Sequence, residues 1–218
     1  MLAAAAAGFA TSRLAGDLTV DTMAVVIVAE VYALLVASLL IAFRGSRRRG
    51  LGLASVDAKT LAVGLGVWAT VCVGALLAYG LVSLLWTPEP SVLDVLAGIG
   101  SDDGRLADAN AWTAVLILGR SWLLAPLAEE LLFRGALFGW LRRHLAAWPT
   151  IVVTAALWAL IHQVPVVLPL AFVVGMAAGW LRERTGSTIP LIVAHALTNI
   201  TITVAALILT GWTAPLPL

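Results

Sequence analysis

Two adjacent carboxylates and an arginine, Glu129, Glu130 and Arg134, lie in a stretch of sequence that is otherwise almost wholly apolar. A charged side chain near the centre of a bilayer costs roughly 2.5–3.5 kcal/mol on insertion scales, so these three require partners or a watery cavity. On a helix, Glu130 and Arg134 share one face and can pair, whereas Glu129 is turned by about 100° and points elsewhere. The spacing therefore predicts a structural ion pair beside one spare carboxylate.

Two further pairs of polar or aromatic side chains stand in later apolar segments. Trp158 precedes His162 by four residues, and His195 precedes Asn199 by the same interval, so each pair shares one helix face. Hydrolysis of an amide needs a base that takes a proton from water and donors for the charge that develops on the carbonyl oxygen. Glu129 and His162 suit the first function. His195 and Asn199 suit the second.

The composition describes the elements that must hold these residues. The 218-residue chain is 61% hydrophobic and 11% charged, whereas a soluble globular domain has roughly 45–50% apolar residues. The sequence therefore predicts an all-α polytopic membrane protein, a transmembrane bundle of about six to eight helices with the catalytic cavity among the late helices. The connectors are short, so we expect one integral membrane domain over 1–218. The single cysteine, Cys72, excludes a disulfide framework and a thiolate metal cluster.

Long apolar runs predict the membrane helices. The two early helices are expected at 23–43 and 61–86, and about 20 apolar residues are enough to cross a bilayer. The polar stretch 87–110 is predicted to be an external loop, and 1–10 an interfacial lead-in, because no basic residue precedes its apolar run as in a signal peptide. The later helices are expected within 111–142, 148–162, 164–181 and 188–210.

Basic residues at the ends of these runs predict the topology. Clusters at 44–49 and 182–184 belong on the cytoplasmic side. Counting back, the arginine pair at 142–143 is cytoplasmic too, which requires an odd number of crossings between residue 110 and this pair. That stretch is then one long kinked helix, or one crossing plus a surface or re-entrant piece; two full crossings would leave the pair outside. Pro126 is the predicted break, because proline removes a backbone donor.

The three motifs together resemble a known family. Glu-Glu-x-x-x-Arg at 129–134, aromatic-x-x-x-His at 158–162 and His-x-x-x-Asn at 195–199, in this order on successive late helices, look like the CPBP family of CAAX proteases and bacteriocin-processing enzymes. The family includes the type 2 CAAX prenyl endopeptidase. The likeness covers a core of about 111–210. One departure is Trp158, because the family's second motif usually begins with phenylalanine.

The resemblance implies an intramembrane endopeptidase that hydrolyses a peptide bond of a membrane-associated substrate, either prenylated or transmembrane. By family analogy Glu129 and His162 would hold and activate the water. Glu130 and Arg134 would brace the first helix, with the His195–Asn199 pair forming the oxyanion hole.

The family has also been described as metalloproteases. A zinc ion held by Glu129, His162 and His195 with one open position is a plausible set. The spacing differs from that of the compact His-Glu-x-x-His zinc helix, and we favour a metal-free, glutamate-dependent mechanism. We expect the bilayer and a membrane-anchored peptide or protein as partners, no nucleic acid, and residence in a prokaryotic plasma membrane.

Two other classes of function compete with a protease. A small proton- or cation-coupled transporter or channel subunit would also bury glutamates and histidines, but it predicts inverted repeats and polar residues in both halves. Here the intramembrane polar residues concentrate in the second half, and we place Glu30, in the first predicted helix, outside the site. A catalytically inert relative acting as a membrane scaffold would have lost at least one motif residue, and all are present.

Overall fold

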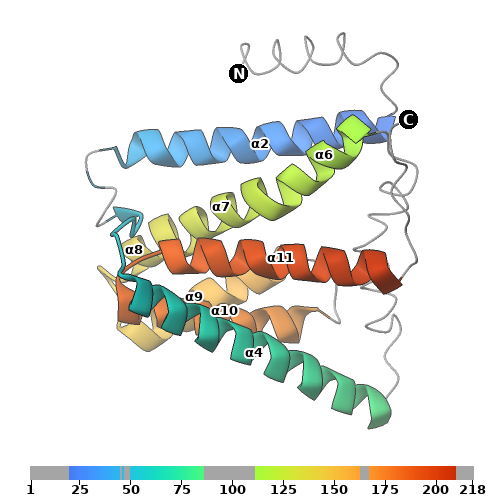
Figure 1. Ribbon diagram of the computed structural model, residues 1–218. Helices are drawn as coiled ribbons and strands as arrows, with labels where there is room; N and C mark the ends of the chain where they lie inside the picture. The colour runs from blue at the N-terminus through green and yellow to red at the C-terminus, as the bar shows by residue number, and fades with distance from the viewer. Residues whose placement is uncertain (1–19, 45, 47–49, 86–110, 163–166, 210–218) are drawn as a thin grey trace.

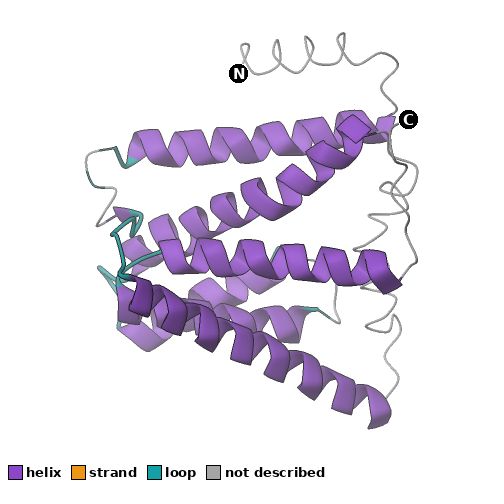
Figure 2. Cartoon of the chain, viewed as in Figure 1, coloured by secondary structure: helices purple, strands orange, loops and turns teal. Residues whose placement is uncertain are grey.

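The computed structural model describes residues 20–44, 46, 50–85, 111–162 and 167–209, and within them every regular element is helical (Figure 2). The all-α prediction is confirmed, and the helices fall close to the predicted apolar runs. The predictions for 1–10 and 87–110, and most of the basic cluster at 44–49, lie outside the described residues. The helices in Figure 1 are α2 (Val20–Ala42), α4 (Ala58–Leu85), a long run over 111–141, α9 (Ala147–Leu160), α10 (Leu168–Thr185) and α11 (Ile189–Leu209).

The long run is one uninterrupted helix with two segments of wider π-helical turns. It consists of α6 (Ala111–Gly119), the π-helix η1 (Arg120–Leu124), α7 (Ala125–Glu130), the π-helix η2 (Leu131–Leu137) and α8 (Phe138–Leu141). The prediction of a break at Pro126 is therefore wrong, and of the open alternatives the chain adopts one long helix. Pro126 lies in the first turn of α7, directly after η1. Because π turns loosen the i→i−4 pattern that proline interrupts, the helix continues through it.

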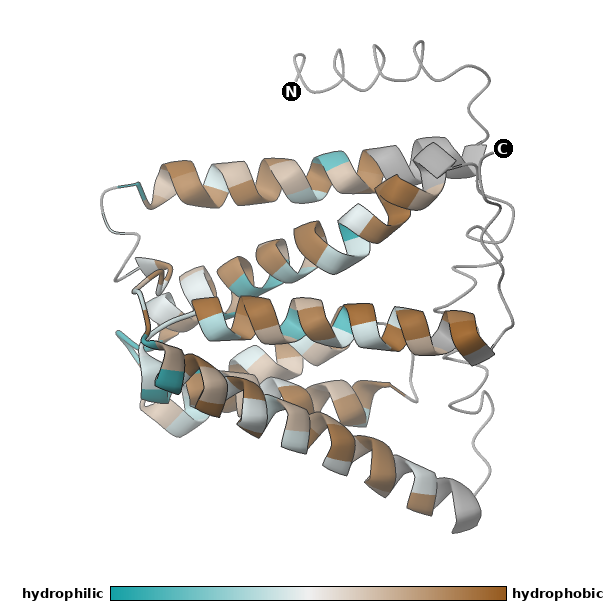
Figure 3. Cartoon of the chain, viewed as in Figure 1, coloured by the Kyte–Doolittle hydropathy of each residue, from teal (hydrophilic) through white to brown (hydrophobic). Residues whose placement is uncertain are grey.

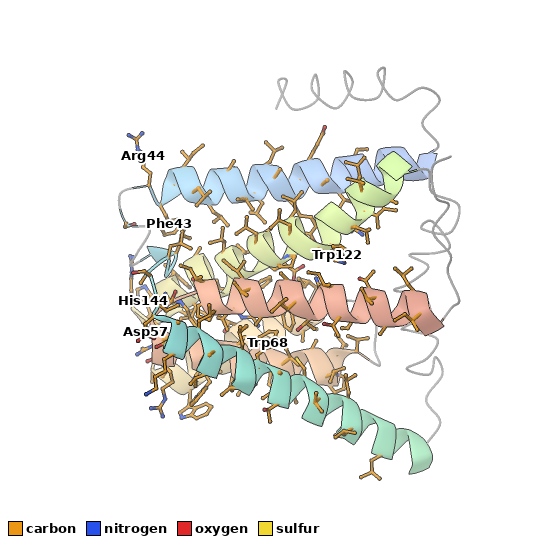
Figure 4. All side chains as sticks on the ribbon, in the orientation of Figure 1. Phe43, Arg44, Asp57, Trp68, Trp122 and His144 are labelled. Carbon is orange, nitrogen blue, oxygen red and sulfur yellow. The ribbon has the colours of Figure 1, made fainter. Side chains whose placement is uncertain are left out.

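The basic turns gather at one end of the bundle, where Figure 4 labels Arg44, Asp57 and His144. Arg142 forms a two-point ion pair with Glu183, with nitrogen–oxygen distances of 2.9 and 3.0 Å, and so ties the α8–α9 turn to the end of α10. At the start of α4, the Thr60 hydroxyl and N–H hydrogen-bond Asp57 and hold the pKa of its carboxyl below the usual value. The shared end agrees with the predicted topology, and its assignment to the cytoplasm stays a prediction.

The connector between α2 and α4 packs against the turn that precedes α11. Leu51 is fully buried, and its carbonyl accepts a hydrogen bond from the Thr188 hydroxyl. The Thr188 N–H donates to the carbonyl of Gly52 at 2.7 Å. Gly52 has a φ of +66°, and a Cβ there would lie 2.5 Å from the Arg182 guanidinium, so only glycine fits this position. The connector therefore fixes the chain of the first half against the turn between α10 and α11.

Helices α9 and α10 approach each other closely because glycines line their contact. A Cβ added to Gly175 would lie 3.1 Å from the Cα of Ala155 and 3.3 Å from the Trp158 ring, and one added to Gly179 would lie 3.0 Å from Ile151. Small residues four apart on a helix are the usual means by which helices pack closely in membranes. This spacing seats the Trp158 ring against α10.

The outer surface of the bundle is that of a protein in a bilayer. In Figure 3 apolar residues cover the bodies of the helices, and hydrophilic residues collect at the end that carries the basic turns. Among the described residues, one stretch, Ala58–Ala78, is long and apolar enough to cross a membrane by length and composition; shorter apolar stretches are Ile27–Ala42, Ala147–Leu160 and Ile189–Ala205. Large apolar side chains such as Leu77 and Ile208 are exposed over about 70% of their surface. The fold is a membrane helix bundle.

Candidate active site

The buried charges of the first motif form a three-member cluster. Glu130 and Arg134 have side chains with no exposed surface, and the Arg134 Nη1 donates to the Glu130 Oε1 at 3.1 Å. The predicted ion pair is therefore present. The same Oε1 lies 3.1 Å from the Nδ1 of His195 on α11. This second contact was not predicted, and it joins the first motif to the third.

The Trp158 ring contacts a charged or polar side chain of every motif. Its Nε1 donates to the Glu129 Oε2 at 2.8 Å. The Arg134 guanidinium carbon lies over the ring, 4.5 Å from its centre. The imidazoles of His162 and His195 meet it edge-on, at 4.7 and 5.7 Å between ring centres. Trp158 is only 4% exposed, and the charged and polar groups of the three motifs surround its ring.

His162 lies just beyond the last residue of α9, in the turn that follows. Its Nδ1 is 3.0 Å from the carbonyl oxygen of Trp158, one of the carbonyls that a helix end leaves without a partner in the helix. A carbonyl oxygen only accepts, so Nδ1 carries the hydrogen in this contact. In the neutral imidazole the lone pair is then on Nε2, and that atom can take up a proton.

The third motif on α11 is held by residues from two other helices. His195 stacks against Trp68 of α4, with 6.4 Å between the ring centres and 28° between their planes, and the Trp68 Nε1 in turn donates to the Thr198 hydroxyl at 2.8 Å. The Asn199 Nδ2 donates to the carbonyl of Ser121, in η1, at 2.9 Å. An amide nitrogen has two hydrogens, so one remains for another acceptor.

A cavity of about 600 Å³ opens between α4, α9, α10 and α11. Its polar wall consists of Ser121, His162, His195, Asn199 and three threonines of α11, Thr198, Thr201 and Thr203. Most of the remaining wall is apolar, and α4 supplies Leu65, Trp68, Ala69, Cys72, Val73 and Leu76. The structure thus brings His162, His195 and Asn199 to one cavity. Glu129 does not itself line this cavity, but it hydrogen-bonds the Trp158 indole, which does.

The residues considered as zinc ligands do not converge. The Glu129 Oε2 accepts from Trp158, and the Nδ1 of His195 faces Glu130. Within the part of the chain that the structure describes, no group of three or more histidine, cysteine, aspartate and glutamate side chains is placed to hold a metal ion. As placed, the described side chains thus do not form the zinc set of Glu129, His162 and His195, and whether the reaction uses a metal stays a prediction.

Comparison with known proteins identifies the motif-bearing part of the chain. Residues 111–201 match the family model described as Type II CAAX prenyl endopeptidase Rce1-like. This segment is therefore similar to the CAAX protease family. No curated protein and no solved structure matches the chain. The Rce1-like segment contains all seven motif residues, so the match supports a CAAX-type membrane protease at the level of the family.

Among the residues outside the Rce1-like segment, two aromatic side chains contact motif residues, and the sequence did not predict either. Trp68 of α4 stacks on His195. Tyr32 of α2 lies near the Glu129 side chain and interacts with it. Each is a lone aromatic residue in an apolar helix, where an aromatic side chain ordinarily reads as packing or as an interface anchor. Only the tertiary arrangement distinguishes them, because nothing in their local sequence indicates a polar partner.

Proposed function

We propose that the protein is an intramembrane endopeptidase that hydrolyses a peptide bond of a membrane-anchored substrate with a water activated by Glu129 and His162. The observation that carries the proposal is the contact of both residues with Trp158. Glu129 is hydrogen-bonded to the indole nitrogen, and His162 meets the ring edge-on while its Nδ1 is bound to the Trp158 carbonyl. A carboxylate and a free imidazole nitrogen are thereby available beside one aromatic ring.

In this mechanism the water loses a proton to the Glu129–His162 pair, and its oxygen attacks the carbonyl carbon of the scissile peptide bond. The proton then passes to the leaving amine as the C–N bond breaks. Negative charge develops on the carbonyl oxygen during the attack. The free hydrogen on the Asn199 Nδ2 and, when the ring is protonated, the Nε2–H of His195 can donate to that oxygen. Glu130 orients His195 through Nδ1, which leaves Nε2 for the cavity.

The cavity supports a substrate that carries a long apolar group. Its histidine and asparagine side chains come from α11 and from the turn after α9, and an apolar wall extends along α4 over Leu65, Ala69, Cys72 and Leu76. We propose that the scissile peptide lies at the polar part and that a prenyl chain or a transmembrane segment occupies the apolar part. The compact, alanine-rich sequence supports a prokaryotic plasma membrane as the location.

The experiment is cleavage of a quenched fluorescent peptide by the protein purified in detergent. Substrates with a prenyl anchor, with a transmembrane anchor and with none are compared. Glu129→Ala, His162→Ala and His195→Ala are expected to lower kcat by at least about 100-fold, the usual loss when a catalytic base or an oxyanion donor is removed. Matched controls are Glu30→Ala, on α2, and His144→Ala, an exposed histidine at the end of the bundle.

Cleavage that survives in all three site variants would rule out the mechanism, and an inactive wild type across the substrate panel would favour a scaffold function. We further propose that the reaction needs no metal, so a chelator is expected to leave kcat unchanged. Activity that is lost on chelation and restored by zinc would overturn that part of the proposal alone.

A further inference from the structure

The Glu129 carboxylate faces possible donors from two helices that lie far apart in the sequence. The Trp158 Nε1 of α9 donates to its Oε2 at 2.8 Å, and the Tyr32 hydroxyl of α2 lies near enough to the same side chain to interact with it. Figure 1 shows α2 running beside the long motif-bearing helix, and the two are in contact along η1, α7 and η2. Tyr32 lies outside the segment 111–201 that matches the family.

Two neutral donors suit a carboxylate that must take up a proton. A glutamate side chain has three rotatable bonds, so without partners it would populate several rotamers. Its two oxygens offer about four acceptor sites. Donors from Tyr32 and Trp158 fix the direction of the carboxylate and still leave sites for a water. The Arg134 guanidinium attracts Glu129 through its charge, but its direct hydrogen bond is to Glu130.

The donor from α9 depends on the identity of residue 158. Phenylalanine, the more usual residue at the start of this motif in the family, has no N–H and cannot hydrogen-bond Glu129. Trp158 is itself fixed, because the Arg134 guanidinium lies over its ring and Gly175 leaves room for it on α10. The indole nitrogen therefore has a defined position from which to orient the carboxylate.

We propose that Tyr32 and Trp158 are positioning residues that jointly aim the Glu129 carboxylate at the reacting water. The first half of the chain then completes the site. This inference rests on the proposed function, because it assigns a task to groups around the candidate base. It differs from that proposal in a testable way, since Glu129 can be essential whether or not these two donors matter.

The test uses Tyr32→Phe, Trp158→Phe and the double variant, assayed with the best cleaved peptide of the panel. Each substitution keeps an aromatic ring and removes one donor to the carboxylate. Hydrogen bonds to charged groups are strong enough that each loss is expected to lower kcat by about 10- to 100-fold. KM is expected to stay within about twofold of wild type. A residue that merely supports the fold would change the amount of active protein or the KM rather than kcat per folded molecule.

Two control variants separate positioning from general damage. Trp122→Phe removes the indole N–H that donates to Thr203 at 3.3 Å, on the same long helix but away from Glu129. Glu30→Gln changes α2 two residues from Tyr32. Both are expected to keep kcat within about twofold of wild type. Thermal unfolding in detergent is measured for every variant, and if Trp158→Phe does not fold, Tyr32→Phe alone decides.

Wild-type kcat in Tyr32→Phe and Trp158→Phe, together with an inactive Glu129→Ala, would refute the positioning role and leave the proposed function standing. A rise in KM with unchanged kcat would also refute it, because the donors would then act on substrate binding. Wild-type activity in Glu129→Ala would overturn the proposed function itself.

Discussion

The buried ion pair between Glu130 and Arg134 makes a sharp prediction about stability. Replacing Arg134 by methionine keeps most of the side-chain volume but leaves the Glu130 carboxylate, which has no exposed surface, without its cation. Removing one partner of a buried ion pair typically costs about 3–5 kcal/mol, because the remaining charge is uncompensated. Loss of the guanidinium from the face of the Trp158 ring adds about 0.5–2 kcal/mol. We expect Arg134→Met to lower the free energy of unfolding by about 3.5–7 kcal/mol.

The exposed pair between Arg142 and Glu183 is the matched control. It has comparable donor–acceptor distances, 2.9 and 3.0 Å, but its side chains are 33% and 32% exposed. Water and salt screen such a pair, and exposed pairs contribute at most about 1 kcal/mol. Arg142→Met is therefore expected to cost no more than about 1 kcal/mol. The same arginine-to-methionine substitution thus compares the cost of breaking a buried ion pair with that of breaking an exposed one.

A double variant tests the physical reason for this difference. Glu130→Gln combined with Arg134→Met removes both charges and leaves a neutral amide that can still accept from His195. Since the penalty of the single variant comes from the unpaired carboxylate, the double variant is expected to regain at least about half of the lost free energy. The assay is reversible unfolding in mixed detergent micelles, monitored by circular dichroism. A cost for Arg134→Met no larger than that for Arg142→Met would refute the reasoning.

Three further tests follow from the packing, and two of them have a control substitution. Ala69→Phe, in the apolar wall of the cavity, is expected to raise KM at least about tenfold for long apolar anchors and much less for short ones, since each excluded methylene costs about 0.8 kcal/mol. Ala78→Phe, on the opposite side of the same helix, should leave the preference for anchor length unchanged in the peptide assay. Gly175→Ala places a Cβ 3.1 Å from the α9 backbone and is expected to cost about 1–3 kcal/mol in micelle unfolding. Gly74→Ala meets nothing within 4 Å and is expected to stabilise by up to about 1 kcal/mol. Gly52→Ala forces a side chain to a φ of +66° against an arginine guanidinium, and a thermal-shift measurement should detect the loss; an unchanged midpoint would contradict the assigned strain.

The sequence predicts well those features that depend on residues close together in the chain. Apolar runs placed the helices, because a chain in lipid must satisfy its backbone polar groups within each helix. The four-residue spacing predicted the pair of Glu130 and Arg134, because residues four apart on a helix are neighbours. The break expected at Pro126 is wrong because the rule that proline breaks a helix assumes regular α-helical turns before the proline. The chain instead has the π turns of η1 there.

What the sequence could not predict is which groups meet across the bundle. The contact of Glu130 with His195 joins residues 65 positions apart, and no periodicity encodes it. Residue 158 is another case. In the sequence, tryptophan in place of phenylalanine looks like a conservative exchange of one aromatic residue for another, yet in the fold the indole N–H is a donor to Glu129. The chemical difference between indole and phenyl matters only once an acceptor lies opposite it.

The two adjacent glutamates show how the fold assigns different tasks to identical side chains. Glu130 lies fully inside the bundle, and its Oε1 contacts both Arg134 and His195. Water has no access to it, so its task is to hold the cation and the imidazole in place. Glu129 is only partly buried, and its Oε2 accepts from the uncharged indole N–H of Trp158, with Tyr32 nearby. These contacts leave some of its acceptor sites unused, so we expect Glu129, rather than Glu130, to be the carboxylate that takes up a proton from a water.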